Sequence, residues 1–183
     1  MPDELIKWLH IFYGYFHDLA IAVYIGGAVA MEFVLGPAQN AIPPAQAQVM
    51  GQKTADRFLW LVWGSLTLIV VTGVLRLQRM GLIVGEWPPF KSPLEWSDSY
   101  GRTVIGLLVI WVVLLINGVL ITFVLRPRLT GKMSAGTSAS QVTARQGARL
   151  QAARWIMYLT RADLGLALVA ALFGASLKWG GIL

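Results

Sequence analysis

Four long apolar runs constrain the fold of this chain more than any other feature. They cover about 8–36, 58–77, 103–125 and 155–178. A helix rises about 1.5 Å per residue, so about 20 residues cross the roughly 30 Å hydrocarbon core of a bilayer. Each run is long enough, and 56% of the chain is hydrophobic, more than is typical of soluble domains. The sequence therefore predicts an all-α integral membrane protein, a four-helix bundle in which residues 1–183 form one domain without internal repeats.

The positions of the basic residues predict how this bundle lies in the membrane. Cytoplasmic connections of membrane proteins are enriched in Lys and Arg. The connection after the first run carries Lys53 and Arg57, and six basic residues without one acidic residue follow the third run. We therefore expect both termini on the periplasmic or outer side of a bacterial inner (plasma) membrane. We therefore expect the basic residues behind the net charge of +6 to contact lipid headgroups, and we do not expect nucleic acid as a partner. The six residues are Arg126, Arg128, Lys132, Arg145, Arg149 and Arg154.

Both histidines of the chain lie in the first apolar run. His10 and His17 are seven residues apart and so share one helical face, which continues to Tyr24 and Met31. Ionisable residues are costly in lipid and mark candidate functional sites. The two imidazoles lie about 10 Å apart along a straight helix, too far to chelate one ion, because metal–nitrogen bonds are about 2 Å long. Each histidine is therefore predicted to serve its own site, or one completed by another helix.

Two cofactors suit this histidine face. Met31 adds a thioether, which together with imidazole suits Cu(I). A haem b needs only one axial histidine from this helix, and Gly14, between the histidines, leaves room for a flat ligand. The alternative without a cofactor is that each histidine bonds a neighbouring helix or lies at the headgroup boundary. No motif of a soluble-type active site is present, so no catalytic residue is assigned.

Further polar residues lie inside the apolar runs. Arg161 and Asp163, near the start of the fourth run, are expected to pair with neighbouring helices, and Glu32 is a predicted partner. Such pairs tie helices together in many membrane proteins. The second connection, about 76–102, is rich in aromatic residues. It is predicted to lie at the headgroup level or to dock a protein partner.

Three short motifs resemble those of one family of membrane proteins. The first run has a leucine-histidine pair and a later glycine pair, a tyrosine-glycine-arginine sequence enters the third run, and an arginine-x-acid-leucine-glycine pattern opens the fourth. In these motifs the chain resembles the copper resistance protein D (CopD-like) family. The motifs are Leu9-His10, Ile25-Gly26-Gly27, Ser99-Tyr100-Gly101-Arg102 and Arg161-Ala162-Asp163-Leu164-Gly165.

This resemblance implies a membrane protein of copper transport or homeostasis. His10, His17 and Met31 would then be metal ligands, and Tyr100 and Arg102 would join the polar residues of structural or functional importance. A second similarity, through the leucine-histidine pair, is to the membrane-bound, haem-containing protoporphyrinogen oxidases. Three functions therefore stay open: copper binding, which we favour here, a haem-b-binding subunit in electron transfer, and a non-catalytic small subunit of a larger membrane complex. Partners are expected to be the lipid bilayer and either other subunits or further copies of the chain.

Overall fold

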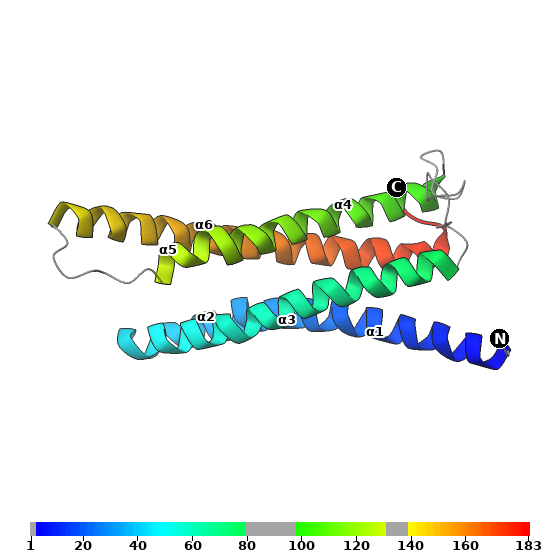
Figure 1. Cartoon of the computed structure of the whole chain (residues 1–183), viewed down its shortest axis with the longest axis horizontal. Helices are drawn as coiled ribbons and strands as arrows, with labels where there is room; N and C mark the ends of the chain where they lie inside the picture. Colours follow the sequence, from blue (N-terminus) through cyan, green and yellow to red (C-terminus); the bar gives the residue numbers. More distant parts are fainter. Residues whose placement is uncertain (1–2, 80–97, 131–138) are drawn as a thin grey trace.

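The computed structural model describes residues 3–79, 98–130 and 139–183 (Figure 1). Most of the aromatic second connection lies outside these residues, so its predicted role is not addressed by the structure. The described chain is almost entirely helical. Its elements are α1 (Asp3–Val29), the π-helical segment η1 (Ala30–Leu35), α2 (Gly36–Asn40), α3 (Pro44–Arg79), α4 (Ser99–Val119), the π-helical segment η3 (Leu120–Leu125), α5 (Arg126–Thr130), α6 (Ala139–Ser176) and the 3₁₀ turn η4 (Leu177–Trp179).

The fold confirms the predicted all-α membrane protein. Within the described chain, four helical stretches are long and apolar enough to cross a bilayer. Large apolar side chains also cover the outside of the bundle: Trp60 is 81% exposed and Phe33 67% exposed. Such exposure would be costly in water but is expected where lipid is the solvent. The chain is therefore a multi-pass membrane protein.

Two of the spanning helices are longer than their apolar runs. α3 begins at Pro44, about 14 residues before the predicted span, and α6 begins at Ala139, about 16 residues before its span. Proline is well suited to the first turn of a helix, because its missing N–H would have no partner there. The polar extensions carry helix-forming Ala, Gln and Arg, which a search for apolar runs does not detect. α6 runs without a break from its polar extension into the last span.

Helix does not end at the Gly36-Pro37 and Arg126-Pro127 pairs, where the sequence had predicted the ends of two spans. It continues to Asn40 and to Thr130. A π-helical segment precedes each proline, one over Ala30–Leu35 and one over Leu120–Leu125. A proline removes one backbone donor and clashes with the carbonyl four residues earlier. The wider π turn accommodates both changes, so the helix axis continues past the proline.

These two segments also reveal an internal repeat that the sequence analysis missed. Phe33–Pro37 and Phe123–Pro127 match at four of five positions and lie 90 residues apart. Both copies follow the same course, a π-helical segment that leads into a short α-helix. The phenylalanine that begins each copy is exposed on the outside of the bundle, Phe33 by 67% and Phe123 by 68%. The bundle is thus built from two helical hairpins with corresponding π-helical segments in their first helices.

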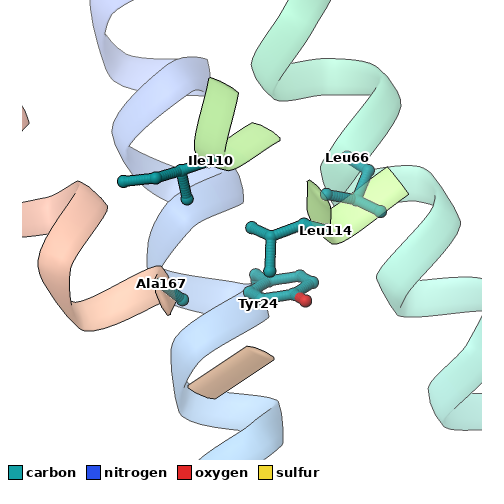
Figure 2. Packing of buried hydrophobic residues seen from close by; sticks show 5 residues of the cluster. All are labelled: Tyr24, Leu66, Ile110, Leu114 and Ala167. Atoms are coloured by element: carbon teal, nitrogen blue, oxygen red, sulfur yellow. The ribbon is translucent and has the colours of Figure 1, made fainter. Parts of the chain in front are cut away.

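The two hairpins pair α1 with α3 and α4 with α6, and α1 also packs on α6 (Figure 1). Both termini lie at one end of the bundle, as four spans require. The core lies where the hairpins meet, and Figure 2 shows its side chains converging from all four spanning helices. Its buried members are Tyr24, Leu66, Ile110, Leu114 and Ala167.

Candidate functional site

His17 is fixed against the neighbouring helix α3. Its Nδ1 lies 2.8 Å from the Oγ1 of Thr72, and Thr72 is only 3% exposed. The Thr72 hydroxyl in turn donates to the backbone carbonyl of Leu68, at 2.5 Å. A threonine in a helix commonly makes this bond to the carbonyl four residues earlier. The imidazole is therefore held by a hydroxyl whose own orientation is set by the backbone.

This arrangement determines which nitrogen of His17 carries the proton. A hydroxyl has a single proton, and that of Thr72 is directed at the carbonyls of Leu68 and Ile69, at 2.5 and 3.3 Å. The Thr72 oxygen therefore accepts from His17, which makes Nδ1 the protonated nitrogen. The lone pair of a neutral imidazole then lies on Nε2. Among the described residues the hydrogen bond of His17 to a side chain is formed by Nδ1, so Nε2 is the nitrogen that a ligand would use.

Two glycines shape the space around the imidazole. A Cβ atom on Gly73 would lie 3.5 Å from Cε1 of His17, so this glycine allows the ring to rest against the backbone of α3. Gly14 lies one turn before His17, and a Cβ there would meet no described atom within 4 Å. The space expected beside Gly14 is thus present and is not filled by another helix.

His10 and Met31 are not brought to this site. His10 is exposed on the first turns of α1, about 10 Å from His17 along the helix axis. Met31 lies in the π-helical segment η1, about 20 Å from His17 on the other side of Tyr24. Tyr24, between them on the same face, is buried in the core (Figure 2). The histidine face predicted from the sequence is therefore divided, with His17 alone packed against a second helix.

No cluster of metal ligands forms within the described ranges. Across 3–79, 98–130 and 139–183, no three His, Asp or Glu side chains come together. A small ion such as Cu(I) usually takes several ligands from the protein, whereas a haem iron needs only one or two. What the chain presents is a single, oriented imidazole nitrogen.

The other intramembrane polar residues form links between helices. Nε of Arg161 lies 2.7 Å from Oε1 of Glu32, so α6 and η1 are joined by an ion pair. Asn117 donates to Asp163 at 2.7 Å, which joins α4 to α6. The predicted pairing of Arg161 with Glu32 is confirmed. The partner of Asp163 is an amide rather than a charge, and Asp163 is 8% exposed.

Tyr100 and Arg102 lie in the first turn of α4, where their motif closes one end of the bundle. Asp98 caps this helix, since its Oδ2 accepts from the Gly101 backbone N–H at 3.3 Å. Thr103, the next residue of the helix, is fully buried and accepts from the backbone N–H of Ile182 at 3.0 Å. Thr103, the residue after the motif, thus anchors the C-terminal residues to the start of the third span.

Thr72 and Thr103 were both missed by the sequence analysis. Threonine is only weakly polar and does not interrupt an apolar run, so neither residue stood out among the charged residues of the spans. The one available signal was the Thr72-Gly73 pair, a hydroxyl beside a residue without a side chain in the middle of a span. Such small and hydroxylated residues are common where membrane helices meet.

Comparisons of this chain with protein-family models, with curated proteins and with solved structures find no match.

Proposed function

We propose that this chain is a haem-b-binding protein of the bacterial inner membrane in which Nε2 of His17 is an axial ligand of the iron. The observation that carries the proposal is the hydrogen bond from His17 Nδ1 to Thr72, at 2.8 Å. Metal-bound histidines typically donate their other N–H to a fixed acceptor, which sets the tautomer and the ring orientation. Thr72 provides such an acceptor.

The surroundings of His17 also suit a large flat ligand. The open space beside Gly14 lies one turn from the imidazole. Arg76, one turn after Thr72 on α3, is exposed and interacts electrostatically with His17. A cation in that position would pair with a carboxylate of the porphyrin. These features favour haem over a small copper ion, whose predicted ligands His10, His17 and Met31 lie too far apart to share one metal.

A haem bound in this way supplies one-electron chemistry within the membrane. Within the chain, Thr72 orients this ligand through its hydrogen bond with His17. We place the termini on the outer side of the membrane, so His17 would lie in the outer half of the first span. A role in electron transfer follows, with the partner protein or quinone as the other reactant.

Purification from membranes with gentle detergent tests this proposal. An absorption spectrum should show a Soret band and about one haem per chain, with the band lost in His17→Ala and kept in His10→Ala. Metal analysis of the same samples measures the amount of bound copper per chain. One copper ion per chain and no pigment would contradict haem binding and would support the copper function that the CopD-like motifs imply. Pigment retained in His17→Ala would remove His17 from the site.

A further inference from the structure

An open pocket of about 430 Å³ lies at the opposite end of the first hairpin from His10. One wall is formed by the end of α1 and by η1, and the other by the first half of α3. In Figure 1 this is the end of the bundle that also holds α5 and the start of α6. It carries the basic connections that the sequence places in the cytoplasm, so the pocket lies where headgroups of the inner leaflet meet the hydrocarbon core.

The rim of the pocket carries two positive charges without acidic partners. Lys53 and Arg57 are both exposed, and they share a face of α3 because they are four residues apart. Neither forms an ion pair among the described residues. Two acidic residues adjacent in sequence to lining residues are engaged elsewhere, since Asp56 pairs with Arg126 and Glu32 pairs with Arg161. The rim therefore has an uncompensated double positive charge.

The inner part of the pocket is apolar. Phe58 and Leu61 line it from α3, and Ala30 and Met31 line it from the facing helix. Gly27 leaves room for the ring of Phe58 in this lining. A Cβ atom on Gly27 would lie 2.7 Å from Cε2 of Phe58 and would push the ring away. Lys53 and Leu61 are eight positions apart, which corresponds to about 12 Å along the helix. The lining thus changes from cationic to apolar over the depth of a headgroup and the first part of an acyl chain.

We propose that this pocket binds one anionic phospholipid. The phosphate would lie between Lys53 and Arg57, within reach of the Thr54 hydroxyl, and one acyl chain would follow Met31 and Leu61 into the bilayer. Charge complementarity selects the headgroup, because a zwitterionic lipid would bring its own cation to the rim. Basic pockets between membrane helices on the cytoplasmic side bind anionic headgroups in this way. The bound lipid would join η1 to α3 at the point where the first span is interrupted.

Native mass spectrometry of the full chain in detergent tests this proposal with three probes: phosphatidylglycerol, phosphatidylcholine and inorganic phosphate. One phosphatidylglycerol should be retained in preference to phosphatidylcholine, and phosphate alone should not displace it. Lys53→Gln combined with Arg57→Gln should weaken retention about 25-fold, because each cation contributes a factor of about five in affinity for an anionic lipid. The matched control is Arg145→Gln with Arg154→Gln, which removes the same charge from exposed positions on α6 and should retain the lipid as the wild type does.

A second variant tests the apolar half independently of charge. Ala30→Leu adds bulk to the lining and should reduce lipid retention while leaving the basic rim intact. Equal retention of phosphatidylcholine and phosphatidylglycerol would overturn the proposal, as would equal losses in the rim variant and the control. Displacement by phosphate alone would identify a simple anion site instead. Circular dichroism on each variant shows whether it remains helical, and Ala30→Leu decides the question if the double variant does not fold.

Discussion

Nδ1 of His17 donates to Oγ1 of Thr72 across the interface between the first two spans, at 2.8 Å. This bond joins the only partly buried histidine of the described chain to a hydroxyl that is itself bonded to its own helix backbone. It determines the tautomer of the ring and leaves Nε2 available.

Thr72→Val removes the acceptor and keeps the shape of the side chain. The imidazole then loses its orientation, and haem affinity should fall about 10- to 100-fold, the usual effect of losing the partner of a metal-bound histidine. Haem titration of the purified apo protein measures this change. Thr122→Val is the matched control, because Thr122 makes the same bond to its own helix and accepts from Trp63 of α3, far from His17. An equal loss of affinity in both variants would contradict an orienting role for Thr72.

Side-chain size at Gly73 should control the position of His17. Gly73→Ala places a methyl group 3.5 Å from Cε1 of the ring, an ordinary contact, so pigment should be retained. Gly73→Leu needs the space that the imidazole occupies and should abolish binding. Gly64→Leu is the control on the same helix, where an added Cβ atom meets nothing within 4 Å. If Gly73→Leu binds haem as the wild type does, the imidazole does not rest on this glycine.

The direct contact between Glu32 and Arg161 should contribute to the stability of the protein, beyond what either charge contributes alone. Glu32→Gln or Arg161→Gln should each lower the free energy of unfolding by about 1.5–3 kcal/mol, the range for a hydrogen bond to a charged group. Exchanging the two residues, as Glu32→Arg with Arg161→Glu, should recover part of the loss. Unfolding in mixed micelles measures these differences. Additive losses in the exchanged variant would show that the pair contributes no coupling energy.

The absence of cysteine makes the topology directly testable. A single cysteine at Gln146, exposed on the basic part of α6, should react with a membrane-impermeant maleimide only after the cells are opened. A cysteine at Ile182, which is 55% exposed near the C-terminus, should react in cells whose outer membrane alone is permeabilised. The reverse pattern would place the basic connections outside and would contradict the predicted orientation.

The fold could be predicted because lipid imposes one strong requirement. A backbone without water must satisfy its hydrogen bonds internally, so four apolar runs become four helices. The polar N-terminal parts of α3 and α6 were not predicted as parts of the spanning helices, because they extend beyond the apolar runs. The π segments were not predicted either, because an apolar run that ends beside a proline does not show that the helix widens locally and continues.

The candidate site could be predicted only in part, for a different reason. The ionisable residues were found because charge is conspicuous in an apolar run, and the pairing of Arg161 with Glu32 was anticipated. The partner of His17 was not, because Thr72 lies 55 residues away in sequence and a hydroxyl is hardly distinguishable from apolar neighbours. Helical periodicity places residues on one face of one helix. It does not say which residue of another helix that face will meet.

The most direct test of haem ligation by His17 is chemical rescue of His17→Gly. This variant, purified from membranes, should lack the Soret band, and adding imidazole together with haem should restore it, because free imidazole can enter the space that the side chain leaves. His10→Gly should show the band without any addition. A Soret band of normal intensity in His17→Gly without imidazole, or the absence of bound haem in the wild-type protein, would contradict the account.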